Sequence, residues 1–566
     1  MSNLMTDVLV VGGGGAAARA ALEASMEGAD VTLAVKGSFG SVGIRGSGAT
    51  ASAISEAGAI IAAGKSEPPL WSIDPDKDLA DILQLGLGLA DRKLATVLVE
   101  ESFQAREDLR DWGWVFHLWG IKNHGVPIVA VLESQIRKRD INIMDHTMIV
   151  DLLVHDGVCV GAIGVHEMTG ETLVIQAQAV VLCTGGDANL YQFNLNPPCT
   201  TGDGYAMGYR AGAELMNLEF KQMTLGMAYP TKNMVFDWVL QSHAKFTNGN
   251  GEEFLENYIP EGVTRDEVLK ARGMSNMFST RVPVSTYFDI ALVSEVKEGR
   301  GTPRDCIFLD LRDSGVNLGP AERQQWWEYR GVNWRTDVVE IAFSHHCSNG
   351  GFRIDENGQT TLPNLYAVGE CAAGPHGADR SGGHMLSACQ VYGKRAGRHA
   401  AAHSESNKHL QLDSKQLDSA RDAIRQIEDG QGDLSPFELK ADLQKKAWRD
   451  LLLIRSQSSL QGMLDYIDHA RSDALPKLSA ATPADKVASL ELRNLVDVGE
   501  VVSSVCLERT ESRGSHYRVD FPERDDANWQ RCITARREDG SIALDSVVVD
   551  PEWQFRDGDM GDTHWG

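Results

Sequence analysis

Residues 7–35 read DVLVVGGGGAAARAALEASMEGADVTLAV, and this stretch decides the fold. The apolar run from Asp7 to Val11 is typical of a strand, and the Ala-rich run from Ala16 to Glu27 is typical of a helix. A second apolar run, Val31 to Val35, predicts another strand. The chain is therefore expected to open with a strand, a glycine turn, a helix and a parallel strand.

The glycine turn carries the pattern Gly12-x-Gly14-x-x-Ala17 directly after the first strand and at the start of the helix. In this position, backbone N–H groups and the positive end of the helix dipole can bind a pyrophosphate. The pattern alone is weak, because a glycine-rich turn can also serve only to pack a helix on a sheet. The order of strand, turn and helix favours a dinucleotide.

The dinucleotide is predicted to be a flavin rather than NAD. An NAD site usually has an acidic residue at the end of the second strand, but this chain has Val35-Lys36 there. Two more apolar strands end in small or acidic residues, Val180 to Gly186 and Leu365 to Glu370. Several strands that end beside one ligand suit a long dinucleotide lying across the carboxyl edge of a sheet.

Composition narrows the class of protein. The 566 residues are 42% hydrophobic and 23% charged, and at roughly 150 residues per domain they predict three to four folded units. The net charge of −25 disfavours nucleic acid and anionic membrane surfaces, and no apolar run is long enough to span a bilayer. Nine cysteines without a C-x-x-C pair indicate reduced thiols and no iron–sulfur cluster in the chain itself. With no signal-peptide pattern at the N-terminus, a cytoplasmic protein is expected.

Five motifs occur in order along the chain: Val10 to Ala16, Thr201 to Gly204, Tyr209 to Glu214, Arg509 to Gly514 and Pro522 to Asp526. With them the chain resembles the flavoprotein subunits of succinate dehydrogenase and fumarate reductase, whose relatives include L-aspartate oxidase and adenylylsulfate reductase. The resemblance implies an α/β fold: a glutathione-reductase-like Rossmann FAD-binding domain with an inserted α+β capping domain and a C-terminal helical domain.

The resemblance and the change of pattern along the chain predict the domain boundaries. Residues 1–225 and 342–405 would form the FAD-binding domain, 226–341 the inserted capping domain for the substrate, 406–530 the helical domain, and 531–566 an irregular tail. The inserted segment is rich in Trp, Pro, Met and Tyr and has little clear periodicity, which suits an insertion better than a sheet core.

The resemblance also implies which residues bind FAD. The glycine turn and the helix start would line the pyrophosphate, Thr184 and Gly185 the adenosine side, and Glu370 a ribose or ribityl hydroxyl. A helix starting near Leu386 would direct its N-terminus at the isoalloxazine. The expected cofactor-binding set is Gly12, Gly14, Gly15, Ala16, Ala17, Lys36, Ser47, Gly48, Ala49, Thr184, Gly185, Asp203, Glu370 and Leu386.

Many relatives bind FAD covalently through a histidine in the segment that corresponds to residues 45–50. This chain has Arg45-Gly-Ser-Gly-Ala-Thr50 there, and its first histidine is His117. Non-covalent FAD is therefore expected, with small residues that let the backbone approach the ring.

On the substrate side, Arg380 lies in a Gly-rich loop, and the planar fork of an arginine can hold a carboxylate with two hydrogen bonds. Family members have an arginine at this place as a carboxylate clamp, and His346 matches the family histidine that helps to bind the same group. The alternatives are a surface loop arginine and a solvated histidine.

Two departures from the family pattern concern the rest of the substrate site. The second carboxylate-binding histidine is replaced by Thr224, and the arginine that delivers the proton has no ungapped match, so Arg281 is its nearest candidate. His384, with Tyr392, could be an alternative acid. Several large side chains could widen the pocket for a larger substrate or could simply pack in the core: Met223, Tyr229, Trp238, Trp326 and Trp327.

These patterns predict an FAD-dependent oxidoreductase that transfers hydride through flavin N5 at a CH–CH or C=C bond of a small anionic substrate other than fumarate. Electrons would be exchanged with a ferredoxin-like iron–sulfur subunit, because the sequence shows neither cluster ligands nor an NAD(P)H fingerprint. Two alternatives stay open: sulfur chemistry like that of adenylylsulfate reductase, and a non-catalytic flavoprotein that relays electrons. The sequence also leaves an oligomer open.

Overall fold

The structure is a computed structural model, and it describes residues 3–41, 48–52, 75–114, 125–235, 239–240, 243–273, 283–315, 321–380, 382–406, 414–428, 432–452 and 454–553. Three residues singled out from the sequence, Ser47, Trp238 and Arg281, lie outside the described residues, as does the side chain of Trp326.

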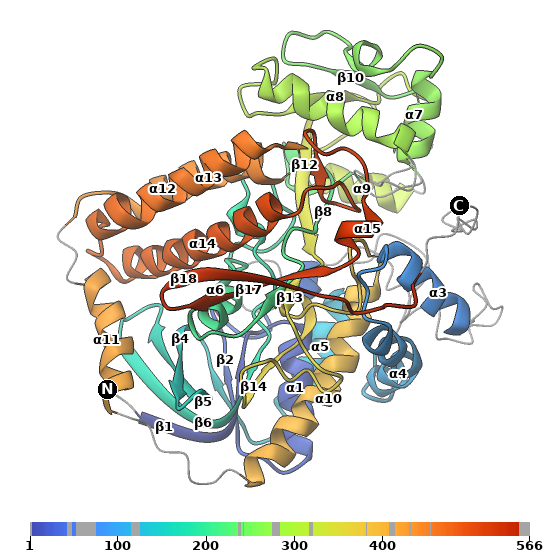
Figure 1. Ribbon diagram of the computed structural model, residues 1–566. Coiled ribbons are helices and arrows are strands. Elements are labelled where there is room, and N and C mark those ends of the chain that lie inside the picture. The colour runs from blue at the N-terminus through green and yellow to red at the C-terminus, as the bar shows by residue number, and fades with distance from the viewer. Residues whose placement is uncertain are drawn as a thin grey trace.

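The centre of the molecule is a seven-stranded sheet whose strands lie in the order β3-β2-β1-β6-β5-β4, with β14 also paired to β6 (Figure 1). Strands β1, β2, β3, β6 and β14 are parallel, whereas β5 pairs antiparallel with β6 and with β4. The bounds are β1 (Asn3–Val11), β2 (Val31–Ala34), β3 (Ile141–Met144), β4 (Thr147–His155), β5 (Val158–His166), β6 (Thr172–Leu182) and β14 (Leu365–Ala367). This arrangement confirms the predicted α/β class.

The carboxyl ends of the central strands meet at one edge of this sheet. The N–H of Gly12, just after β1, donates to the carbonyl of Ala34, and the N–H of Cys183, just after β6, donates to the carbonyl of Val11. The N–H of Val368, just after β14, donates to the carbonyl of Leu182. The loops that follow β1, β2, β6 and β14 therefore lie side by side, as a doubly wound sheet requires.

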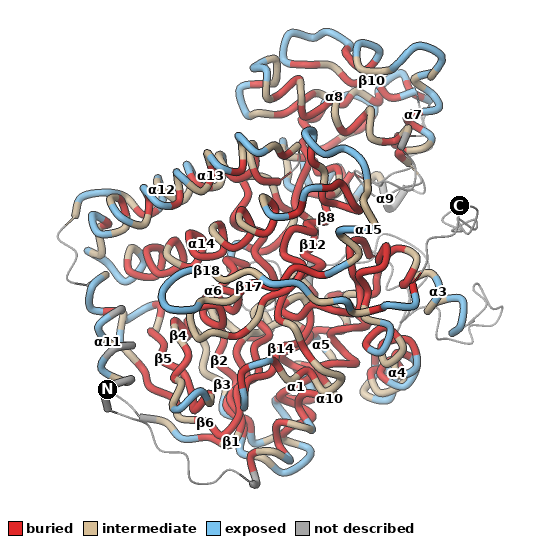
Figure 2. Tube along the Cα trace, in the orientation of Figure 1, coloured by how far each residue is buried: buried red, intermediate tan, exposed pale blue. Residues whose placement is uncertain are grey.

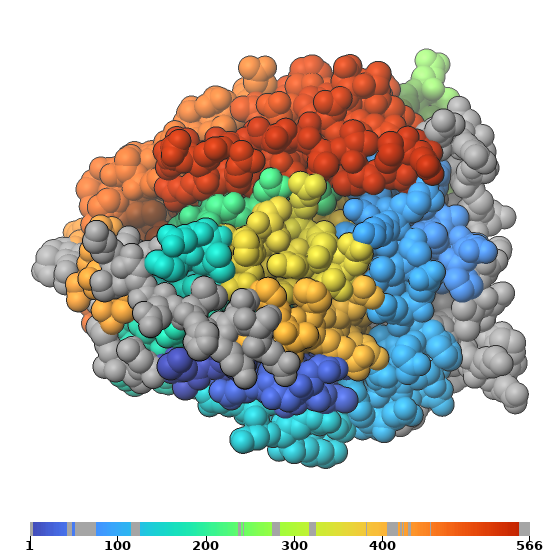
Figure 3. All heavy atoms as spheres, turned by 60° about the horizontal axis from the view of Figure 1, so that its bottom comes forward, coloured from blue at the N-terminus to red at the C-terminus, as the bar shows by residue number. Residues whose placement is uncertain are grey.

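One face of the sheet is covered by α1 (Gly15–Met26) and α10 (His384–Ser406), which cross closely. Glycines on α10 make this approach possible, since a Cβ at Gly397 would lie 2.3 Å from the carbonyl oxygen of Ala20. The α1 segment is buried almost throughout, which explains its alanines (Figure 2). In the space-filling view, α10 lies between the N-terminal segment and α3 (Pro75–Leu85) with α4 (Arg92–Asp111) (Figure 3).

The segment between β8 and β12 forms a second unit at the top of Figure 1. Its sheet has the order β10-β11-β12-β8-β9, all antiparallel. The elements are β8 (Lys221–Tyr229), β9 (Asn233–Met234), β10 (Lys245–Thr247), α7 (Arg265–Arg272), α8 (Thr286–Lys297), β11 (Ile307–Asp310), α9 (Ala321–Tyr329) and β12 (Val338–Ser348). The long strands β8 and β12 connect this unit to the rest of the molecule, and its assignment as a capping domain stays a prediction.

The C-terminal part is helical up to residue 508. Its helices are α11 (Ser414–Glu428), α12 (Pro436–Ala447), α13 (Gln457–His469), α14 (Pro483–Glu508) and α15 (Asp526–Trp529), and a short parallel pair joins β15 (Ile454–Arg455) to β16 (Tyr517–Arg518). The remaining helices and strands are α5 (Gly125–Ile136), α6 (Asp203–Arg210), β7 (Leu215–Met216) and β13 (Gly351–Phe352). No described helix has the length and apolar character needed to cross a membrane.

The expectation of an irregular tail after residue 531 is wrong for its first part. β17 (Cys532–Glu538) and β18 (Ser541–Val547) form an antiparallel hairpin, and β17 also pairs with β7 of the FAD-binding part (Figure 1). Burial of Ile533 and Ala535 against the core stabilises a strand that has Arg and Glu at its far end.

Candidate active site

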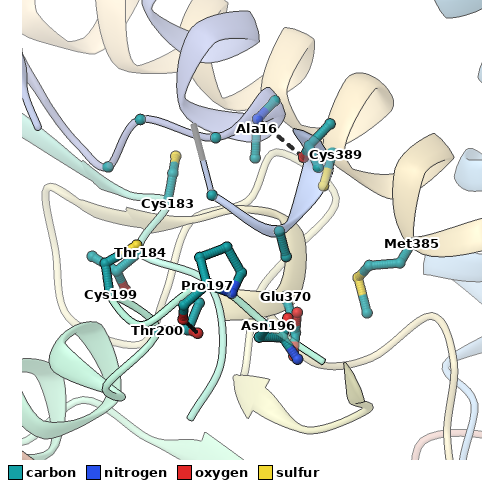
Figure 4. Close-up of a pocket in the computed structure, with 18 of the residues that line it drawn as sticks. Ala16, Cys183, Thr184, Asn196, Pro197, Cys199, Thr200, Glu370, Met385 and Cys389 are labelled. Atoms are coloured by element: carbon teal, nitrogen blue, oxygen red, sulfur yellow. Dashed lines mark hydrogen bonds between the residues drawn. The ribbon is translucent and has the colours of Figure 1, made fainter. Parts of the chain in front are cut away.

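A cavity of about 680 Å³ lies at the carboxyl edge of the central sheet. Figure 4 shows residues of its walls: Ala16 and Cys389 come from α1 and α10, Cys183 and Thr184 follow the end of β6, and Asn196, Pro197, Cys199 and Thr200 come from the segment whose Cys199 and Thr200 lie beside Thr184. The site predicted from the sequence is largely brought together here. Its cavity-lining members are Gly12, Gly14, Gly15, Ala16, Lys36, Gly48, Ala49, Thr184, Gly185, Asp203, Glu370, Leu386, His346 and Arg380.

Four predicted site residues are placed differently or not described. Ala17 is buried behind the glycine turn and does not line the cavity, and His384 lies beside Arg380 but outside the lining. Ser47 and Arg281 lie outside the described residues, so their assignments stay predictions.

The glycine turn has the geometry that a bound pyrophosphate requires. Gly12 has φ of +130°, and a Cβ there would lie 2.4 Å from the carbonyl oxygen of Cys183. Gly14 is the N-cap of α1, which is 12 residues long, and a Cβ at Gly48 would lie 3.1 Å from the Cα of Gly14. The backbone segments at Cys183 and Gly48 therefore lie close to the glycine turn at the N-terminus of α1. A helix N-terminus lined by glycine backbone in this way suits the phosphates of FAD.

Replacing Gly12 by alanine is expected to remove most of the bound flavin. A side chain at this φ is strained by about 1–3 kcal/mol, and its Cβ must also displace the backbone of Cys183. The measurement is the ratio of flavin absorbance to protein in the purified variant. Gly28→Ala is the matched control, because Gly28 also has positive φ but nothing lies within 4 Å of its Cβ position. Equal flavin content in the two variants would contradict this role of the turn.

At the other end of the cavity, Lys36 occupies the place where an NAD enzyme has its acidic residue. Its Nζ lies 2.7 Å from Thr201 Oγ1, 2.8 Å from Asp203 Oδ2 and 2.8 Å from Glu491 Oε1. Burial alone would lower the pKa of Lys36, but the two carboxylates outweigh it and raise the pKa. The two carboxylates of Asp203 and Glu491 outweigh the single positive charge of Lys36. This end of the cavity therefore offers hydrogen-bond acceptors, which suit the hydroxyls of a neutral sugar better than a phosphate.

Arg380 is buried at the substrate side of the cavity, and Gln222 and Asp379 are among its partners. Its Nη2 donates to Gln222 Oε1 at 2.7 Å, and its backbone N–H donates to Asp379 Oδ1 at 2.9 Å. The amide of Gln222 donates in turn to Asp379 Oδ1 and to the carbonyl of Arg380, at 3.1 and 3.0 Å. Gln222, a strand residue that sequence reasoning did not assign, therefore fixes the direction of the guanidinium.

The histidines around Arg380 are neutral. Burial, and then the charge of Arg380, lowers the pKa of His346 to about 3 and that of His384 to about 4. The same causes lower the pKa of His376 well below its usual range. Near neutral pH and without an anion in the cavity, these imidazoles are therefore uncharged, and the role of His384 as an alternative acid stays a prediction.

An ion pair that was not predicted from the sequence lies beneath the site. Lys221, on β8, has its Nζ 2.9 and 2.8 Å from the two carboxylate oxygens of Asp187, and both side chains are fully buried. The hydroxyl of Ser348 donates to Asp187 at 2.7 Å, and the N–H of Ser348 donates to Glu370 Oε1 at 2.9 Å. The sequence signal for this pair was Lys221 itself, which stands between Phe220 and Gln222 in a predominantly apolar stretch. A lysine that is buried in such a strand needs an acidic partner.

Burial raises the pKa of Glu370 to about 7, partly opposed by the hydrogen bond from the N–H of Ser348. Near neutral pH this carboxyl group can therefore both donate and accept hydrogen bonds. That capacity suits the predicted contact with a ribose or ribityl hydroxyl.

The large side chains proposed to widen the pocket do not line it where they are described. Met223 is buried in the core, and Trp327 packs edge-on against Trp334 at 5.3 Å between ring centroids. Tyr229 is at the exposed end of β8, where the guanidinium of Arg304 lies over its ring. These residues pack against other side chains, as the alternative interpretation held, and the apolar lining of the cavity includes Leu195, Met234 and Met385.

The comparisons with known proteins agree with this geometry. A family described as "FAD binding domain" matches residues 7–126 and 117–386, and one described as "Fumarate reductase flavoprotein C-term" matches 440–556. The chain is 32% identical over 568 residues to a fumarate reductase (CoM/CoB) subunit of Methanothermobacter marburgensis, and the match covers 94% of this chain and 97% of that protein.

Solved structures show the same likeness. The Mycobacterium smegmatis Sdh1 complex is 26% identical with a TM-score of 0.81, covering 98% of this chain and 96% of the other. The fold of Escherichia coli quinol fumarate reductase also matches, with 23% identity, a TM-score of 0.81, and coverage of 96% and 97%. L-aspartate oxidase is similar in sequence, and adenylylsulfate reductase is similar in fold.

Proposed function

Because the chain belongs to the fumarate reductase and succinate dehydrogenase family of FAD-dependent flavoproteins, we propose that it oxidises or reduces a carbon–carbon bond beside the carboxylate of a small acid. The observation that carries this proposal is Arg380, a buried guanidinium that lines the cavity and is aligned by Gln222. A fixed cation in a cavity of this kind favours an anionic ligand.

FAD supplies the hydride chemistry at N5 of its ring. Gly12, Gly14 and Gly15 would hold its pyrophosphate, and Thr184, Lys36 with Asp203, and Glu370 its sugar and adenosine parts. The cofactor is proposed to be non-covalent, because no histidine precedes His117 in the sequence. Gly48 and Ala49 line the cavity at the place where relatives can carry such a histidine.

Arg380 would bind the substrate carboxylate, with Gln222 and Asp379 holding it in place. Neutral His346 would donate a hydrogen bond to the same carboxylate. The charge of a bound anion favours the protonated form of a nearby imidazole, so substrate would raise the pKa of both His346 and His384. Arg281 remains the proposed proton donor on the strength of the resemblance, and His384 is the second candidate, protonated only when the anion is bound.

The substrate is proposed to differ from fumarate. Thr224 replaces the second carboxylate-binding histidine, and in the structure it pairs with Ser344 in the β8–β12 ladder and does not line the cavity. The grip on one carboxylate is thus retained, while the other end of the substrate must meet different residues.

Electrons are proposed to pass to or from an iron–sulfur subunit. The M. marburgensis relative is itself named as one subunit of its enzyme, and the M. smegmatis structure as a complex. No disulfide joins any of the nine cysteines, all of which lie among the described residues, and this supports the proposal of a reducing, cytoplasmic location.

The proposal is tested by chemical reduction of the holoprotein without air, followed by mixing with a panel of α,β-unsaturated acids. At least one acid is expected to restore the visible absorbance of oxidised flavin, whereas its saturated counterpart is not. The flavin should also separate from the polypeptide in acid, since it is not bonded covalently. Reoxidation by an artificial electron acceptor but by none of the acids would instead favour a protein that only relays electrons.

A further inference from the structure

Lys232 is a lysine of the cavity wall that no part of the proposed mechanism uses. It precedes the short strand β9, which folds back along β8 so that Met234 lies opposite Gly226. Its Nζ donates to Asn194 Oδ1 at 3.0 Å and to the carbonyl of Asn196 at 2.9 Å. Asn233 and Met234 line the cavity beside it, and Arg330 lies at the same wall.

The ammonium of Lys232 differs from the other lysines near the site because it has no carboxylate partner among the described residues. Lys36 is paired with two carboxylates and Lys221 with one. Although the side chain of Lys232 is accessible to solvent, surrounding protein atoms desolvate it and lower its pKa to about 8. An anion in the cavity could pair with this ammonium through a charge-assisted hydrogen bond.

The hydrogen bonds of Lys232 place it on the substrate side of the cavity. Asn196, whose carbonyl accepts from Lys232, donates through Nδ2 to the carbonyl of His346 at 3.1 Å. The neighbouring Asn194 lies beside His345 in a parallel bridge. Lys232 is therefore two hydrogen bonds from the backbone of His346, and the segment that accepts from it continues to Cys199, whose carbonyl lies 3.5 Å from Nζ of Lys36.

We propose that Lys232 binds a second acidic group of the substrate, so that the site selects acids with two anionic groups, one on Arg380 and the other on Lys232. This inference rests on the proposed function, because it takes Arg380 as the first anchor. It assigns to Lys232, on the β8–β9 turn, the role that Thr224 cannot fill.

The test measures dissociation constants by titration calorimetry on the oxidised holoprotein, so that it does not depend on turnover. The probes are matched pairs in which one acid lacks the second carboxylate: trans,trans-muconate with sorbate, and 4-carboxycinnamate with cinnamate. The wild-type protein is expected to bind each diacid about 10- to 100-fold more tightly than its partner, the range for one charge-assisted hydrogen bond. Lys232→Gln should abolish this preference and leave the dissociation constants of the monoacids unchanged.

Two further variants separate binding from structure. Lys232→Arg should retain most of the preference for diacids, since it keeps the charge. Lys245→Gln is the matched control, because Lys245 is exposed on β10 of the same unit and does not line the cavity. Flavin content and thermal midpoint should be equal in all variants.

The possible outcomes have different meanings. A wild-type protein that binds both members of each pair equally would overturn the role of Lys232 and leave the proposed function intact. Equal weakening of diacids and monoacids in Lys232→Gln, or loss of flavin, would likewise overturn it, since the lysine would then serve the structure or the cofactor. If the wild-type protein binds neither member of either pair, this inference is overturned, while the reoxidation of the reduced flavin by the panel of acids decides the proposed function separately.

Discussion

Replacing Arg380 by alanine is expected to lower kcat/KM for the acid substrate by about 10²- to 10³-fold while the protein keeps its flavin. Truncating one member of a buried, hydrogen-bonded charge pair typically costs about 2–5 kcal/mol, and here the substrate carboxylate would lose its anchor. Arg380 is 5% exposed, so water cannot easily replace the guanidinium. The measurement is steady-state kinetics, with flavin content determined on the same samples.

Two variants sharpen this experiment. Arg380→Lys keeps the charge but not the planar fork, so it should recover only part of the lost activity. Arg353→Ala is the control, since Arg353 is 43% exposed and paired with Glu214 away from the cavity. Unchanged kcat/KM in Arg380→Ala would show that the substrate binds elsewhere, and loss of flavin would show that Arg380 supports the cofactor.

Replacing Lys221 by methionine is expected to destabilise the protein by about 3–5 kcal/mol, because it leaves the carboxylate of Asp187 charged and unpaired in the interior. The hydroxyl of Ser348 would still donate to this carboxylate, but it brings no positive charge. The measurement is denaturant unfolding of the holoprotein, followed by tryptophan fluorescence and by release of flavin.

The double variant Lys221→Met/Asp187→Leu should recover most of this loss, since it removes both charges from the interior. Lys477→Met is the control for losing an ion pair, because Lys477 and Asp473 are 56% and 48% exposed, and it should change stability by less than about 1 kcal/mol. A small effect of Lys221→Met, similar to that of the control, would mean that Asp187 takes up a proton readily and that the pair matters little.

Much of the architecture could be predicted because it depends on sequence patterns within short segments. The period of apolar residues in 7–35 and the glycines between them predict a strand, a turn and a helix without knowledge of any other segment. The apolar runs that end just before Thr184 and Glu370 likewise predict strands that are followed by a turn. Since carboxyl ends of parallel strands share one edge, these local predictions were enough to bring most of the residues predicted to bind FAD to one cavity.

The resemblance added Arg380 and His346, but the sequence did not predict their electrostatic state. His384 was considered as an acid from its residue type alone. Its low pKa comes from burial and from the nearby guanidinium, which depend on how α10 packs against the loop before it. The hairpin after residue 531 was missed for a related reason, because β17 is stabilised by pairing with β7, more than 300 residues earlier in the chain.

The sequence by itself thus determined the flavin fold, because glycine spacing and apolar period act over a few neighbouring residues. Only the tertiary structure decided which polar groups meet: Lys221 with Asp187, Gln222 with Arg380, and Lys232 with the segment beside His346. A buried charge or amide takes its partner from whatever the packed chain places within hydrogen-bond distance, and that partner can stand anywhere in the sequence.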